Sequence, residues 1–182
     1  AILTLAVQML LTGAMHEDGL SDCADGFYGG HFRARRLEIM KDSRVGAYGV
    51  IALMVSLGLR VAALAAAPNA LAGAIALVAL AVASRAPLPF VMRLMPLARP
   101  KGLGALASGV GMASAVVALA LGEVALFFLP RTEILAPVMA LAAVVVSLEA
   151  LRKIGGFTGD TLGATQQVEI AGWVVLAAVW QA

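Results

Sequence analysis

Long apolar segments constrain the fold of this chain more than any other feature. Residues 45–67 carry one charge, Arg60, and are long enough to cross a bilayer core, which needs about 20 helical residues. Of the 182 residues, 62% are apolar and 13% are charged, whereas soluble domains average about 45–50% and about 25%. This composition excludes an ordinary soluble domain.

Six apolar stretches are found with a window of about 19 residues. They predict an all-α fold, a polytopic transmembrane helical bundle. The first stretch is apolar from residue 1 and has no basic flank, so we expect it to be the tail of a helix rather than a signal peptide, with N-terminal helices missing from this chain. The stretches are residues 1–15, 45–67, 71–83, 102–129, 134–151 and 170–180.

The connecting loops differ in basic charge. In chain order they hold five, none, four, one and two Lys or Arg residues. Since these residues accumulate in short cytoplasmic loops, loops one, three and five are predicted to face the cytoplasm. Residues 15–44, 85–101 and 152–169 then lie on one face, where they can build one site.

Two functional classes have little support. The net charge is only +2, and it gives no basic surface for nucleic acid. Cys23 is the single cysteine, so an internal disulfide is impossible and no paired-Cys zinc spacing exists.

An acidic cluster lies at the edge of the first apolar stretch. If residues 16–26 are helical, Asp18, Asp22 and Asp25 have the spacing i, i+4, i+7 and share one stripe. Like charges so close require a cation, and carboxylate oxygens suit Mg²⁺ or Mn²⁺. His16 precedes them as a candidate base, although a lone His is more often structural. The alternative for the stripe is a solvated helix end without function.

A basic segment follows within residues 31–44. Arg forks hold phosphate in a bidentate way, and Gly26 and Gly29 allow a ligand close to the backbone. Acidic residues beside basic ones are typical of phosphoryl-transfer sites, so we expect phosphate binding here and a further metal ligand at Asp42. Anchoring at the membrane surface is the alternative for each Arg. The predicted phosphate-binding residues are Arg33, Arg36, Lys41 and Arg44.

Two later segments add candidates on the same face. The glycine-rich residues 155–163 contain Thr158 and Asp160 but no Walker lysine, so a flexible hairpin is the alternative to a phosphate cradle. Arg85 and Arg99 are further candidates for substrate binding. Within the membrane, Arg60 and Glu123 have two interpretations: a pair in the bundle, or separate side chains that snorkel to an interface.

The string GAMHEDGLSDCADGFYGGHFRARRLEIMKDSRVG, residues 13–46, resembles the cobalamin synthase family, the adenosylcobinamide-GDP ribazoletransferases. Residues 84–85, 98–104 and 155–164 match further motifs of that family in the same order. Glu17 departs from it, since an apolar or different polar residue is common there, and so does Ser21, where Ala is usual.

The resemblance implies one catalytic membrane domain, residues 1–182, that lacks N-terminal helices. It implies a Mg²⁺-dependent transferase that joins adenosylcobinamide-GDP to α-ribazole or its 5′-phosphate and releases GMP, late in vitamin B12 assembly. Metal would be held by Asp18, Asp22 and Asp25, and Asp22, Asp25 or His16 would take the proton of the attacking hydroxyl. Self-association and contact with other corrinoid-pathway enzymes stay open.

Two alternatives come from other functional classes. A cation or substrate transporter would place acidic residues at several depths, whereas here the Asp residues gather at one edge. A membrane scaffold without enzymatic activity is the second alternative, and corrinoid binding without turnover would favour it.

Overall fold

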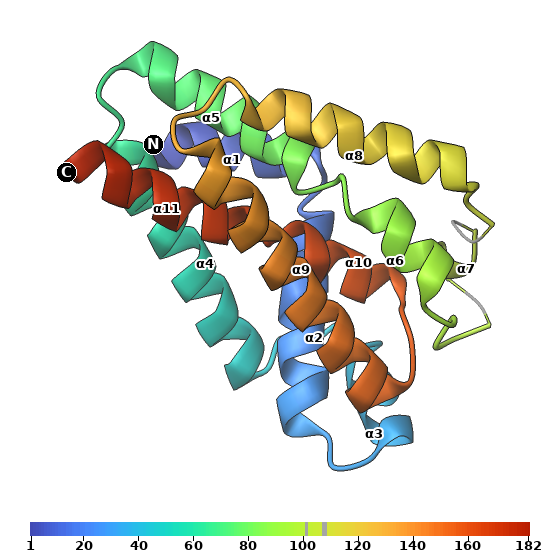
Figure 1. The fold of residues 1–182 in the computed structure, drawn as a ribbon. Coiled ribbons are helices and arrows are strands. Elements are labelled where there is room, and N and C mark those ends of the chain that lie inside the picture. Colours follow the sequence, from blue (N-terminus) through green and yellow to red (C-terminus); the bar gives the residue numbers. More distant parts are fainter. Residues whose placement is uncertain (101, 107–108) are drawn as a thin grey trace.

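The computed structural model describes residues 1–100, 102–106 and 109–182, and within them it confirms the all-α prediction (Figure 1). Leu97 and Phe157 form an isolated parallel β-bridge between two loop segments. The helices are α1 Ile2–Leu11, α2 Met15–Gly29, α3 Arg33–Ile39, α4 Ala47–Ala65, α5 Ala70–Ala83, α6 Leu88–Leu94, α7 Leu103–Leu106, α8 Met112–Leu126, α9 Thr132–Ile154, α10 Gly159–Gln166 and α11 Glu169–Gln181.

Four helical segments of the described residues are long and apolar enough to cross a membrane. They are α4, the pair α5–α6 as Ala70–Leu94, α9, and the pair α10–α11 as Gly159–Gln181. The helices α1 and α8 are apolar but shorter. The expected stretch 102–129 is therefore not one long helix, because glycines at 102, 104, 109 and 111 precede α8.

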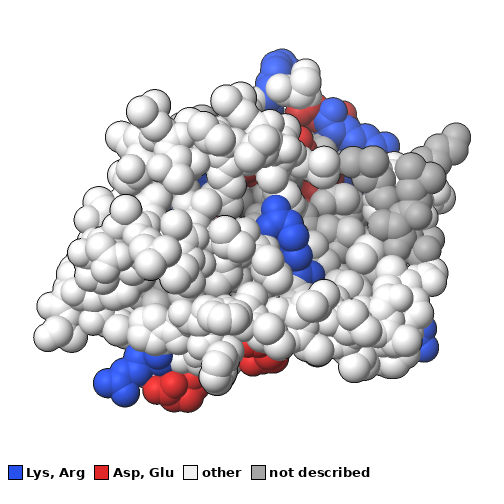
Figure 2. Space-filling view, turned by 90° about the horizontal axis from the view of Figure 1, so that it is seen from above, with Lys and Arg blue, Asp and Glu red and all other residues white. Residues whose placement is uncertain are grey.

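An apolar core joins α5, α8, α9 and α11. Its largest members are fully buried, such as Trp173, Leu80 and Leu135, and alanines on α5 let the neighbouring helices approach. The face shown in Figure 2 is mostly uncharged: one basic side chain lies near its centre, and other charged side chains lie toward its edges. An apolar surface of this kind around a bundle fits contact with lipid.

Helix α2 departs from the apolar pattern, since it begins after a left-handed turn at Gly13 and Ala14 and carries four of the eleven acidic residues. It packs between α4 and α10. A side chain on Gly19 would place its Cβ 2.6 Å from the carbonyl oxygen of Asp160 and 3.1 Å from the Cα of Gly163. Only glycine fits at this crossing, which brings the backbones of α2 and α10 together.

A buried ion cluster, formed by Glu17, Arg60 and Glu169, links α2, α4 and α11. The guanidinium of Arg60 donates through Nη2 to Glu17 at 2.9 Å and through Nη1 to Glu169 at 2.8 Å, and its side chain is 1% exposed. Gln166 donates to Glu169 at 3.0 Å and Gln167 to Glu17 at 3.3 Å. The buried charges are thus ion-paired, as an apolar interior requires, although Oε2 of Glu17 and Nε of Arg60 have no hydrogen-bond partner among the described residues.

We predict that Gly19→Ala forces α2 and α10 apart and destabilises the protein by about 1–3 kcal/mol, the usual cost of overpacking. Gly58→Ala on α4 is the matched control, because its added Cβ has no atom within 4 Å. Thermal unfolding in detergent measures both variants. Equal melting temperatures for the two would contradict the close crossing.

Candidate functional site

The three polar segments that were predicted to share one face do come together. The N–H of Phe157 donates to the carbonyl of Pro96, and the N–H of Ala98 donates to the carbonyl of Phe157, both at 2.9 Å. Gly156 permits this pairing, since a Cβ there would collide with the Pro96 carbonyl. The pairing places Arg99 beside α10, which packs against α2.

The centre of the site is an acidic cluster, formed by Asp18, Asp22 and Asp160 around the guanidinium of Arg99. Arg99 forms an ion pair with Asp160. Burial raises the pKa of Asp22 to about 7, with further contributions from the charges of Asp18 and Asp160. Asp18 is exposed, whereas Asp22 is half-buried. An uncompensated carboxylate with a raised pKa is typical of a functional site.

The glycine-rich segment 155–163 is not a hairpin. Its second half starts α10, where the Thr158 hydroxyl accepts from the N–H of Thr161 at 3.2 Å and the Thr161 hydroxyl accepts from the N–H of Thr158 at 2.8 Å. The Thr158 hydroxyl also donates to Asp160 at 3.2 Å. A cavity of about 90 Å³ opens at this helix start, and Arg99, Thr158 and Asp160 line it together with Leu97, Gly102, Gly104, Ala105 and Gly159. Thr158, Asp160 and Arg99, predicted separately, therefore lie together.

Asp25 has a structural role that was not expected. Its two carboxylate oxygens accept from the N–H of Gly46 at 2.6 Å and of Gly49 at 2.9 Å, at the start of α4. A carboxylate there satisfies unpaired N–H groups and complements the helix dipole. Asp25 thus joins α2 to α4, while its charge also acts on Asp22, and its expected role as a metal ligand or base stays a prediction.

The basic segment lies mostly apart from the acidic cluster. Asp42 pairs with Arg44 at 2.6 Å, and hydrogen bonds from Arg44 lower the pKa of Asp42 to about 2. Arg36 donates to backbone carbonyls of Gly30, His31 and Lys153 and so fastens α3 to the end of α9. These partners account for Asp42 and Arg36 without a ligand.

The remaining basic candidates of the first loop, Arg33 and Lys41, are exposed. Arg33 donates to the carbonyl of Ala98 at 3.3 Å, next to Arg99, so it borders the site. Lys41 makes no hydrogen bond or ion pair with the acidic cluster within the described part of the chain, and its binding role stays a prediction.

His16 and Arg85 are neighbours at the start of α2. Burial lowers the pKa of His16, and the positive charge of Arg85 lowers it further. The imidazole is therefore neutral at pH 7 and able to accept a proton. Arg85 donates to the carbonyl of Ala81 at 2.6 Å, which orients it at the end of α5.

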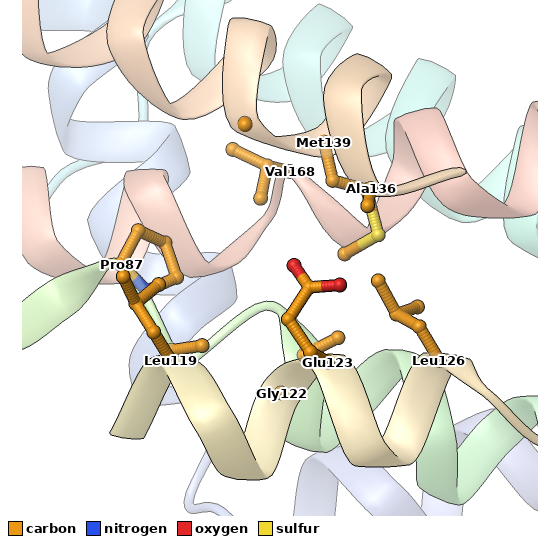
Figure 3. A pocket seen from close by; sticks show the side chains of 11 residues that line it. Pro87, Leu119, Gly122, Glu123, Leu126, Ala136, Met139 and Val168 are labelled. Atoms are coloured by element: carbon orange, nitrogen blue, oxygen red, sulfur yellow. The ribbon is translucent and has the colours of Figure 1, made fainter. Parts of the chain in front are cut away.

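The two intramembrane charges weighed as a pair are not paired. Arg60 binds Glu17 and Glu169 instead. The carboxylate of Glu123 points into a separate cavity of about 60 Å³, which Leu119, Leu126 and Met139 line (Figure 3). The partners of Arg60, Glu17 and Glu169, were not predicted from the sequence. The signal was Arg60 itself, because a charge deep in an apolar stretch requires a counter-ion.

The carboxylates of the acidic cluster are candidate ligands for a metal ion. In the described ranges, 1–100, 102–106 and 109–182, no three His, Cys, Asp or Glu side chains are grouped closely enough to hold one by themselves. Asp18 and Asp22 are two neighbouring carboxylates without a cationic partner of their own. That donor set fits Mg²⁺, which binds through one or two carboxylates and takes further oxygens from substrate phosphates.

Comparison with known proteins agrees with these features. The family model of cobalamin-5-phosphate synthase matches residues 1–179. A relative from Bradyrhizobium diazoefficiens, named adenosylcobinamide-GDP ribazoletransferase, is 45% identical over 184 residues, which cover 100% of this chain and 71% of the relative. One of the same name from Rhizobium meliloti is 46% identical over 191 residues, covering 97% and 73%. No solved structure matches the chain.

The match spans the apolar helices, the acidic helix α2 and the start of α10 alike. The chain therefore belongs to the cobalamin-5-phosphate synthase family and is an enzyme, a transferase.

Proposed function

We propose that this protein joins adenosylcobinamide-GDP to α-ribazole or its 5′-phosphate, with release of GMP, at the cytoplasmic face of a prokaryotic inner membrane. The names of the relatives supply the reaction class. The observation that carries the proposal for the site is the meeting of α2 and α10, which gathers two free carboxylates beside an Arg–Asp pair.

Asp18 and Asp22 would hold Mg²⁺ in this site. When bound, the ion would neutralise charge on the diphosphate of the substrate and on the departing phosphate. Arg99, with Arg33 at the border, supplies guanidinium groups for phosphate oxygens, because a guanidinium presents a planar fork of N–H donors. The ion pair with Asp160 and the hydrogen bond of Asp160 with Thr158 orient Arg99 toward the cavity.

The reaction forms a bond between a ribose oxygen and the phosphorus attached to cobinamide, and breaks the bond from that phosphorus to GMP. The hydroxyl proton must leave as the bond forms. We assign it to His16, which is neutral at pH 7 and lies in the first turn of α2, one turn before Gly19. Asp22 is the second candidate.

A transporter is less well supported than an enzyme. Among the described residues the deeply buried acidic side chains, Glu17 and Glu169, are held by Arg60, so they do not form a free pathway for cations. The carboxylates of Asp18 and Asp22, which are not held in this way, lie near each other on one helix instead of at several depths.

The activity test uses the purified protein in lipid nanodiscs with Mg²⁺, adenosylcobinamide-GDP and α-ribazole. We expect GMP release that EDTA stops and that Asp22→Ala reduces by at least about 100-fold, the usual scale for removing a metal ligand or its support. Glu133→Ala, at an exposed surface pair, is the control and should keep full activity. Equal GMP release from the wild type and Asp22→Ala would overturn the site.

A second prediction follows from the raised pKa of Asp22. The carboxyl titrates near pH 7 in the fold and near pH 4 when unfolded. Its protonated form therefore stabilises the fold fully below about pH 4, and this stabilisation is lost as the pH rises through about 7. In EDTA, Asp22→Asn should melt above the wild type at pH 8 and close to it at pH 4.

Added Mg²⁺ should reduce the difference at pH 8, since the ion stabilises the wild-type carboxylate. Thermal melts of both proteins at the two pH values measure this. A difference that is the same at pH 4 and pH 8 would show that Asp22 has an ordinary pKa.

A further inference from the structure

We propose that Arg60 is a positioning residue for the transfer reaction: through Glu17 and Glu169 it fixes the acidic helix α2 against α10–α11. The proposal rests on the proposed function, because it takes Asp18 and Asp22 as the carboxylates that act on the diphosphate. Arg60 itself is buried and lies away from them, in the interior of the bundle.

The geometry of Arg60 is that of a fork. One guanidinium nitrogen binds α2 through Glu17, and the other binds the first residue of α11, Glu169. A planar group with two nitrogens in fixed relation sets both the distance and the orientation of its partners, which an ammonium group does not. The fork therefore fixes how α2 and α11 lie relative to α4.

Helix α2 is held to α4 at two points. Near its start Glu17 binds Arg60, and near its end Asp25 caps the start of α4. Asp18 and Asp22 lie between these two points, and Asp18 is the residue after Glu17. A shift of α2 would displace both carboxylates directly.

The junction between α10 and α11 is also held by the buried ion cluster. The helix changes from α10 to α11 at Gln167 and Val168, and the side chains of Gln166 and Gln167 join the cluster. Ser84 on α5 accepts from Gln166, and Ser56 on α4 donates to Gln167, both at 3.0 Å. Because α10 carries Asp160, the cluster sets the position of Asp160 as well as that of Asp18 and Asp22.

Stability alone does not account for these charges. Taking ions out of water costs several kcal/mol each, and apolar residues of similar volume often stabilise a protein equally or better. In a bundle that is apolar elsewhere, a charged triad with an amide and hydroxyl shell is a costly way to fill space. What apolar packing lacks is the directionality that keeps α2 in one register, since buried polar groups can specify a single arrangement.

The test separates positioning from stability. In the triple variant Glu17→Leu, Arg60→Met, Glu169→Leu, all charges of the cluster are removed together, so no ion is left unpaired. Gln166 and Gln167 keep each other and Ser84 as partners. We expect a melting temperature near that of the wild type, a kcat lowered 10- to 100-fold, and KM values for both substrates changed less than about threefold.

Arg60→Lys is the second variant. It keeps the buried positive charge, so it provides the test if the triple variant does not fold. It should also lose at least tenfold in kcat, because an ammonium cannot hold both carboxylates in a fork. Arg131→Met, which removes an exposed pair with Glu133, is the control and should change nothing. Wild-type kcat in a folded triple variant, or in Arg60→Lys, would overturn the proposal.

A distance measurement tests the positioning role of Arg60 without depending on turnover. Spin labels at Tyr28 on α2 and Val174 on α11, both exposed, are attached through cysteines in a Cys23→Ala background. The distance distribution between them should be narrow with Arg60 present and broad in the triple variant. Identical distributions would overturn the positioning role, whether or not the wild type shows turnover. Absence of turnover in the wild type would count only against the proposed function.

Discussion

The close contact of α2 with α10 determines where the chemistry of this protein can lie. Gly19 and Gly163 bring the two backbones nearer than any side chain would permit. Asp18 and Asp22 come from one helix and Asp160 from the other, so their gathering depends on this contact. The basic residue among them, Arg99, arrives separately through the short pairing of residues 96–98 with residue 157. Residues from three segments that are distant in sequence therefore meet because glycines allow it.

Charge inside the bundle is of two kinds. The cluster of Glu17, Arg60 and Glu169 is fully buried and paired, and it joins helices. The carboxylates of Asp18 and Asp22 lack such a partner and crowd each other, which is unfavourable without a cation. Among the described residues, the protein thus ion-pairs the charges that hold its fold, although Oε2 of Glu17 and Nε of Arg60 have no hydrogen-bond partner. It leaves Asp18 and Asp22, which are proposed to act on substrate, without an ion pair, as expected where binding compensates the repulsion.

Sequence patterns predicted the membrane bundle, the helix that carries the aspartates, and the convergence of three distant polar segments. They did not predict which neighbour each side chain meets. Helical spacing put Asp25 on the stripe of Asp18 and Asp22, but the unpaired N–H groups at the start of α4 bind its carboxylate. Likewise, the glycines at 155–163 resembled a hairpin, whereas mutual hydrogen bonds of Thr158 and Thr161 start a helix there. The first outcome depends on a tertiary contact, which spacing along one segment does not contain. The second depends on a local capping box, so its signal was present in the sequence as Thr158 and Thr161.

Binding of Mn²⁺, a paramagnetic substitute for Mg²⁺, tests the central claim most directly, because electron paramagnetic resonance reads the ion itself without turnover. The wild-type protein should bind Mn²⁺ saturably. Binding should be lost in the double variant Asp18→Asn, Asp22→Asn and kept in Asp42→Asn, whose carboxylate is paired with Arg44. Binding that survives the double variant and disappears in Asp42→Asn would contradict the account.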